Sequence, residues 1–130
     1  MKKLLLLFFV TVTLLTSCCD SKTNDEQCVS FVPEGIDAVT LIPTTDMTGA
    51  AFNVAFYVNN GCGNFGSFEE IVNGNSITIK VIAKYEGCVC TDDIPLRESV
   101  YTFTSNTSGT YLLKFIKADG TFITETVVIA

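Results

Sequence analysis

The sequence predicts an all-β domain, a sandwich or barrel of about seven to eight antiparallel strands. Apolar residues alternate with other residues along several segments, for example at Phe52, Val54 and Phe56. This is the period of a strand that buries one face. Residues that tolerate a positive φ separate these segments, as hairpin turns require. No window of useful length has a convincing helical repeat.

Residues 1–17 are typical of a signal peptide. Lys2 and Lys3 precede an uncharged run from Leu4 to Leu15. This run has the length of a signal-peptide core and is too short to span a bilayer comfortably as a membrane helix. Removing the segment leaves 130 − 17 = 113 residues, which is enough for one domain with its own core.

The segment Leu15-Thr16-Ser17-Cys18 resembles the lipobox of bacterial lipoproteins, in which an aliphatic residue and two small residues precede a cysteine. The resemblance implies that Cys18 begins the mature chain and carries lipid, and several acyl chains would anchor it stably in a membrane. Cleavage before Cys19 fits the pattern less well. Because residue 19 is not aspartate, the resemblance to Gram-negative lipoproteins implies the outer membrane, at its periplasmic face or at the cell surface.

Residues 18–27 are expected to comprise the lipidated cysteine and a flexible tether, since residues 19–27 include no aliphatic or aromatic side chain that could pack. Residues 28–130 are expected to form a single β-sandwich domain. Its strands are separated by turn-forming pairs at Thr48-Gly49, Asn73-Gly74, Ser108-Gly109 and Asp119-Gly120. The expected strands are 28–32, 36–42, 50–58, 67–72, 76–86, 100–104, 110–117 and 121–129.

The segment from Gly109 to Phe115 resembles the penultimate strand of immunoglobulin-like (Ig-like) domains, where a glycine, a spacer and a corner tyrosine precede an inward-facing residue. Tyr111 is the corner residue, and Leu113 takes the inward position that is a cysteine in antibody domains. No tryptophan is present for the opposing strand. The resemblance therefore implies an Ig-like β-sandwich outside the antibody domains, and this fold implies no function by itself.

The composition excludes several classes of function. The chain has no histidine, which excludes histidine-based triads and histidine–metal sites. Without Lys2 and Lys3 the chain has 6 basic and 14 acidic residues, a net charge of 6 − 14 = −8, which argues against nucleic acid as a partner. No nucleophile–base or carboxylate pair is evident and no cofactor is expected, so an enzyme is a weak alternative.

The four cysteines of the domain, Cys28, Cys62, Cys88 and Cys90, are candidates for two disulfides, because an exported chain reaches an oxidising compartment. A bond between Cys88 and Cys90 would strain an extended backbone. We therefore expect each of these two to pair with Cys28 or Cys62, in either combination. The alternative is a metal-handling protein, in which the four thiolates bind zinc or Cu(I).

An unusual loop is expected from Asn59 to Phe68, because it combines glycines with a cysteine and two aromatic residues. Asn64, Phe65 and Phe68 are candidate recognition residues, since binding concentrates in loops on rigid scaffolds. In the alternative that we prefer, Phe65 and Phe68 close one end of the core.

These patterns together predict a membrane-anchored envelope lipoprotein that acts as a non-catalytic binding or structural module. Its partners would be the membrane, through the N-terminal lipid anchor, and an envelope protein or a glycan. Metal handling and an unrecognised enzyme remain the two alternatives.

Overall fold

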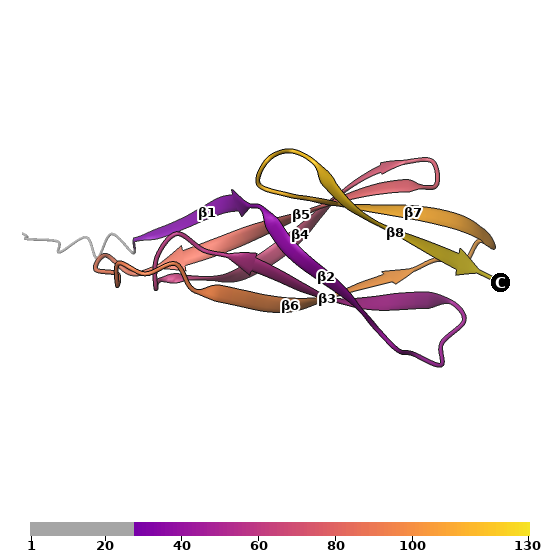
Figure 1. Ribbon diagram of the computed structural model, residues 1–130, viewed down its shortest axis with the longest axis horizontal. Coiled ribbons are helices and arrows are strands. Elements are labelled where there is room, and N and C mark those ends of the chain that lie inside the picture. The colour runs from indigo at the N-terminus through magenta and orange to yellow at the C-terminus, as the bar shows by residue number, and fades with distance from the viewer. Residues whose placement is uncertain (1–27) are drawn as a thin grey trace, which may run out of the picture.

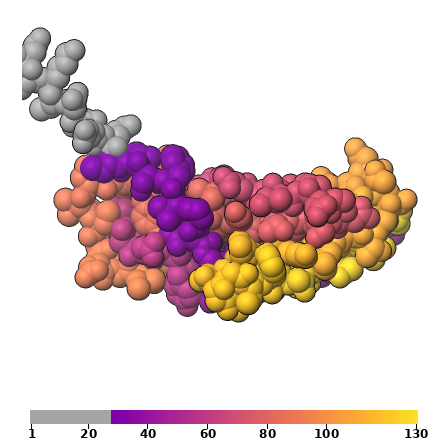
Figure 2. Space-filling model, turned by 90° about the horizontal axis from the view of Figure 1, so that it is seen from above, coloured from indigo at the N-terminus to yellow at the C-terminus, as the bar shows by residue number. Residues whose placement is uncertain are grey.

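The computed structural model describes residues 28–130, so the predicted signal peptide, Cys18 and the tether lie outside the described residues. Eight strands form two sheets that pack face to face as a β-sandwich (Figure 1), and the domain is elongated in the space-filling view (Figure 2). No described helix is long and apolar enough to cross a membrane. The strands are β1 (Val29–Glu34), β2 (Ile36–Ile42), β3 (Gly49–Tyr57), β4 (Gly63–Asn73), β5 (Ser76–Glu86), β6 (Leu96–Thr104), β7 (Gly109–Ile116) and β8 (Phe122–Ile129).

The larger sheet is built around β5. Strand β4 pairs along one edge of β5, while β1 and β7 share the other edge and β8 follows β7. The smaller sheet has the order β2-β3-β6. The chain crosses between the sheets at Gly35, where a Cβ would lie 2.3 Å from the backbone nitrogen of Ala118 in the β7–β8 turn. Glycine is therefore needed at this crossing.

The expectation of purely antiparallel strands is wrong at one pairing, because β5 and β7 run parallel over Ser76–Ile79. All the other paired strands are antiparallel. Parallel neighbours need a long crossover connection. Here that connection contains β6, which belongs to the opposite sheet, so the parallel pair arises from a change of sheet that no local sequence pattern encodes.

The core confirms the period of two. Phe52, Val54 and Phe56 are buried on β3, and Leu113 and Phe115 are buried on β7. The rings of Phe52 and Phe115 meet edge to face across the two sheets with their centroids 5.6 Å apart, which is a favourable aromatic geometry. No polar or charged residue of the described chain is buried.

Two predicted turns have the predicted backbone conformation. Gly74 and Gly120 have φ values of 60° and 81°, which glycine adopts without steric cost. The second turn is closed by the Asp119 carboxylate, which accepts a hydrogen bond from the Thr121 backbone N–H at 3.0 Å. The hydrogen bond from the Thr121 hydroxyl, and then this backbone contact, lower the pKa of the Asp119 carboxyl.

The Ig-like corner is present at the start of β7. The Tyr111 hydroxyl donates to the carbonyl oxygen of Thr107 at 2.9 Å and lies 2.8 Å from Ser105 Oγ. A tyrosine that bonds to the backbone a few residues upstream is the corner expected from the resemblance. Leu113, the expected inward residue, is fully buried.

Two strands begin four residues earlier than expected. Strand β6 starts at Leu96 because Leu96–Ser99 pair with Val54–Tyr57 of β3, so the long-range ladder extends β6 through Arg97 and Glu98. Strand β4 starts at Gly63 because its first residues pair with the end of β5. In both cases the partner strand decides the boundary.

Candidate functional site

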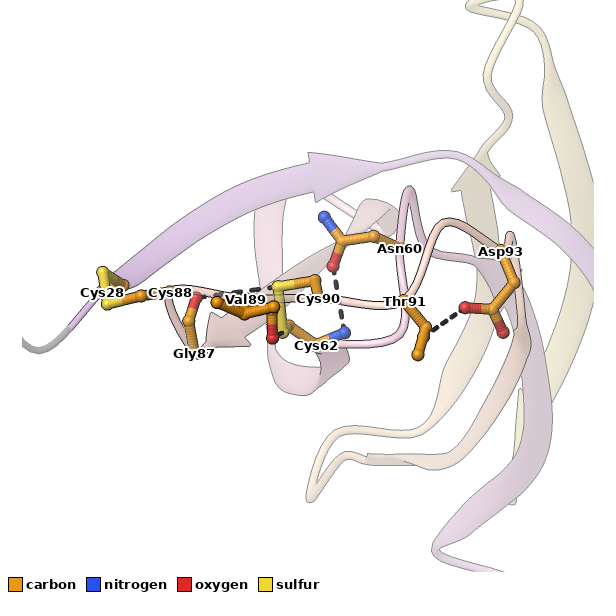
Figure 3. The surroundings of a disulfide bond; sticks show 9 residues. All are labelled: Cys28, Asn60, Cys62, Gly87, Cys88, Val89, Cys90, Thr91 and Asp93. Carbon is orange, nitrogen blue, oxygen red and sulfur yellow. Dashed lines mark hydrogen bonds between the residues drawn. A yellow bond between two sulfur atoms is a disulfide. The ribbon is translucent and has the colours of Figure 1, made fainter.

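The segments that carry the two disulfides lie at the end of the sandwich where the described chain begins (Figure 1), and Figure 3 shows the bonds themselves. Cys28 bonds to Cys88 with their Cα atoms 5.0 Å apart, and Cys62 bonds to Cys90 with Cα atoms 5.3 Å apart. The prediction of two disulfides is therefore confirmed. Of the two pairings that the sequence left open, the structure has Cys28 with Cys88 and Cys62 with Cys90. Because all four sulfurs are bonded to sulfur, none is a thiolate available to a metal in this state.

The disulfides join three separate segments of the chain. Cys28 precedes β1, Cys62 lies in the β3–β4 loop, and Cys88 and Cys90 follow β5. Backbone hydrogen bonds link the same segments, from the N–H of Gly87 to the carbonyl of Cys28 at 2.9 Å and from the N–H of Gly61 to the carbonyl of Thr91 at 3.1 Å. We call these three joined segments, residues 28, 59–62 and 87–91, the clamped end.

Glycines of the clamped end are required by close packing. A Cβ on Gly61 would lie 1.8 Å from the hydroxyl oxygen of Thr91, and a Cβ on Gly87 would lie 2.9 Å from the Cys62 sulfur. Gly87 also has a φ of 133°, a conformation that other residues rarely adopt. Gly61 and Gly87 are therefore required by the close packing of the clamped end, and Gly87 also by its backbone conformation.

The clamped end exposes one apolar side chain between the two bonded cysteines of its last segment. Val89 is 93% exposed and lies between Cys88 and Cys90, both of which are held by disulfides (Figure 3). Carboxylates follow at Asp92 and Asp93, and the Thr91 hydroxyl donates to Asp93. This end of the molecule is therefore cross-linked, and it presents the exposed Val89 side chain close in sequence to the carboxylates of Asp92 and Asp93.

A cleft of about 380 Å³ opens beside the clamped end. This volume lies in the lower part of the range for small-molecule sites. The side-chain Oδ1 of Asn60 accepts a hydrogen bond from the Cys62 backbone N–H at 3.0 Å, and the side-chain amide nitrogen of Asn60 points away from Cys62 (Figure 3). The lining residues are Cys28, Val29, Ser30, Val32, Asn59, Asn60, Tyr85, Gly87 and Cys90.

A three-residue polar cluster borders the cleft, and no local sequence pattern indicates it. The Tyr85 hydroxyl donates to the Glu34 carboxylate at 2.5 Å and accepts from the Asn59 backbone N–H at 2.8 Å, and the Asn59 side-chain amide donates to the same carboxylate at 2.8 Å. Burial is the main cause that raises the pKa of Tyr85, and Glu34 raises it further against the opposing effect of Asn59. Tyr85 is therefore a neutral hydrogen-bonding group at physiological pH.

The arrangement supports binding by hydrogen bonds and apolar contact. The Tyr85 hydroxyl and the Asn59 side chain are engaged with Glu34, and the Asn60 side chain, which also lines the cleft, carries an amide that can donate to a ligand. Among residues 28–130, no group of three or more histidine, cysteine or acidic side chains is placed to hold a metal ion.

The predicted recognition residues lie on a strand. Asn64, Phe65 and Phe68 belong to β4, so the loop expected over 59–68 ends at Cys62. The β4–β5 register shifts between Phe65 and Ser67, and a Cβ on the intervening Gly66 would lie 2.8 Å from a β5 carbonyl oxygen. Residues three apart on a regular strand point to opposite faces, and this bulge brings Phe65 and Phe68 to the same face.

Both aromatic side chains are half-buried and pack against the core, whereas Asn64 is exposed. The ring centroids of Phe65 and Phe68 are 4.7 Å apart, and Phe68 meets the ring of Tyr101 edge to face at 5.3 Å. Of the three candidate recognition residues, Phe65 and Phe68 therefore pack against the core, and Asn64 lies on the surface. A glycine between two aromatics three positions apart was the available signal for the bulge.

Comparison with protein families places most of the sandwich in a known family. Residues 52–129, from β3 to the last residue of β8, match the ORF11 beta-sandwich domain. No curated protein and no solved structure matches the chain. Because the match covers more than half of the 130 residues, the chain belongs to the ORF11 beta-sandwich domain family.

Proposed function

We propose that this member of the ORF11 beta-sandwich domain family is an outer-membrane lipoprotein, anchored through Cys18, whose sandwich acts as a non-catalytic binding or structural module. The observation that carries the proposal is the oxidised clamped end. Two disulfides are typical of chains exported to an oxidising compartment, and both lie where the described chain begins. This agrees with the lipobox-like segment Leu15-Thr16-Ser17-Cys18, ten residues before Cys28.

The position of the disulfides also fits an anchored domain. A tether of residues 19–27 would enter the fold at Cys28, which is bonded to Cys88. A pull on the anchor would reach a covalent cross-link before it reached the hydrogen bonds of β1. The β2–β3, β4–β5 and β6–β7 connections lie at the opposite end of the long axis (Figure 1), so this end would face away from the membrane toward an envelope protein or a glycan.

The anchor is tested by producing the full chain in a Gram-negative host that is fed an alkyne-bearing fatty acid. We expect the chain to take up the label and to fractionate with membranes. Cys18→Ser should abolish the label and release the chain from the membrane, while Cys19→Ser, the matched control, should leave both unchanged. A soluble, unlabelled wild-type chain would overturn the anchor, and loss of label only in Cys19→Ser would move the lipid to the neighbouring cysteine.

A further inference from the structure

Five strands lie at sheet edges, and four of them carry features that prevent pairing with another chain. A proline, a bulge or charged residues protect a sheet edge. Strand β1 contains Pro33, β2 has a register shift beside Asp37, and β4 has the bulge at Gly66. Strand β6 carries Arg97, whose Nε donates to the Gly63 carbonyl of β4 at 2.9 Å, so these two edges also contact each other.

Strand β8 lacks a proline, a bulge and a basic side chain. Within the described chain it is hydrogen-bonded only to β7, and their eight-residue ladder is regular from Phe122 to Ile129. It contains no proline, lysine or arginine, and its one charged residue is the half-buried Glu125. The exposed fraction of Val128 is 70% and that of Phe122 is 45%. A long, regular, apolar edge of this kind is a template for an added strand.

A groove of about 300 Å³ runs beside this edge, between β8 and the end of β2 and start of β3. Its wall on β2 includes Leu41, which is 57% exposed. A strand added to β8 would place alternate side chains toward this groove. The lining residues are Leu41, Ile42, Pro43, Thr44, Asp46, Gly49, Ala50, Phe52, Glu125, Thr126, Val127 and Val128.

Charge indicates the occupant of the groove. Its only charged lining residues are Asp46 and Glu125, and the Thr48 hydroxyl and N–H both donate to the Asp46 carboxylate. A second copy of β8 would bring another Glu125 and no cation. The described residues carry 5 basic and 11 acidic side chains, a net charge of 5 − 11 = −6, so two copies also repel each other. A basic strand from a different protein complements the groove.

We propose that β8 is an acceptor edge for an extended segment of a partner protein in which apolar residues alternate with lysine or arginine. The backbone of the segment would extend the larger sheet. Because alternate side chains of a strand point to opposite faces, its cations would enter the groove toward Asp46 and Glu125, and its apolar side chains would lie on the outer face beside Val128. This inference names a partner chemistry that the proposed function leaves open, and it does not depend on the lipid anchor.

The test uses the full chain in mild detergent and three labelled eight-residue probes with blocked ends. One alternates valine and lysine, the second alternates valine and glutamate, and the third is the valine–lysine peptide with alternate amides N-methylated. Binding is followed by fluorescence anisotropy and by hydrogen exchange of the β8 amides. We expect only the first probe to bind and to slow exchange within 122–129.

Variants then locate the site. Reversing the charge with Glu125→Lys should weaken binding of the valine–lysine peptide about fivefold to tenfold, the range for an exposed ion pair turned into a repulsion. Glu98→Lys on β6 is the matched control and should change the affinity less than twofold. Asp46→Asn removes the other charge of the groove at an exposed position, and it should also weaken binding without altering the half-buried Glu125.

Several results would overturn the proposal. These are binding without slower exchange in β8, equal weakening by Glu98→Lys, or equal binding of the N-methylated or the acidic peptide. A concentration-dependent dimer that protects β8 without any peptide would identify a second copy as the occupant and would likewise overturn it.

Discussion

Removing the disulfide between Cys62 and Cys90 tests how the clamped end stabilises the fold. Cross-linking residues 28 positions apart lowers the entropy of the unfolded chain by an amount equivalent to about 3.6 kcal/mol, and the 60-residue separation of Cys28 and Cys88 gives about 4.3 kcal/mol. We therefore expect Cys62→Ala/Cys90→Ala to lower the free energy of unfolding by about 3.6 kcal/mol. That is a large share of the 5–15 kcal/mol typical of a domain.

The assay is equilibrium unfolding in urea, followed by circular dichroism, of the full chain carrying Cys18→Ser and Cys19→Ser so that no other thiol interferes. The slope of the unfolding free energy against urea should increase, because the uncrosslinked unfolded chain exposes more surface. The matched variant Cys28→Ala/Cys88→Ala should lose about 0.7 kcal/mol more than Cys62→Ala/Cys90→Ala, from the logarithm of the two separations.

A loss below about 1 kcal/mol for Cys62→Ala/Cys90→Ala, with an unchanged slope, would refute the reasoning from unfolded-chain entropy. The hydrogen bonds and close glycine packing of the clamped end would then hold these segments together without the cross-link.

Three further predictions concern the packing and the tyrosines. Tyr111→Phe removes the hydrogen bond to the Thr107 carbonyl and should lower the free energy of unfolding by about 1 kcal/mol, measured in urea. Gly61→Ala places a Cβ 1.8 Å from the Thr91 hydroxyl oxygen and should lower the melting temperature, whereas relief by Thr91→Ala in the double variant would show that the clash is the cause. Burial and Glu70 raise the pKa of Tyr101, so its stabilising contribution is present below the unfolded-state pKa near 10 and falls as the pH rises further. Tyr101→Phe should reduce this alkaline loss of stability, and an unchanged profile between pH 9 and 11 would contradict it.

Local sequence patterns were sufficient for most of the strands. The alternation of buried residues such as Val54 and Phe56 follows from the geometry of a strand, and Gly74 and Gly120 follow from the φ values that tight turns need. Both signals act between near neighbours, so a single sequence displays them. The tyrosine corner at Tyr111 could be predicted for the same reason, because its hydroxyl bonds to the backbone only four residues upstream.

Features that depend on residues far apart in the chain could not be predicted from the sequence. The parallel pairing of β5 with β7 arises from a strand that changes sheet, and the pairing of Cys62 with Cys90 arises from which loops meet at one end. The Tyr85 cluster joins Glu34 and Asn59 across 51 and 26 residues. The unpaired edge of β8 is a property of the strand order, and no pattern within 122–129 indicates whether it has a neighbour.

The most direct measurement is the intact mass of the mature chain, extracted from membranes without reductant and treated with a thiol alkylator. An oxidised, lipidated protein predicts the mass of residues 18–130 plus its acyl groups, less four hydrogens, with no alkyl group on Cys28, Cys62, Cys88 or Cys90. An unprocessed chain without lipid would contradict the anchor. Four reduced domain cysteines, with a zinc or copper ion bound in the native mass spectrum of an unalkylated sample, would contradict the disulfides and favour the metal-handling alternative.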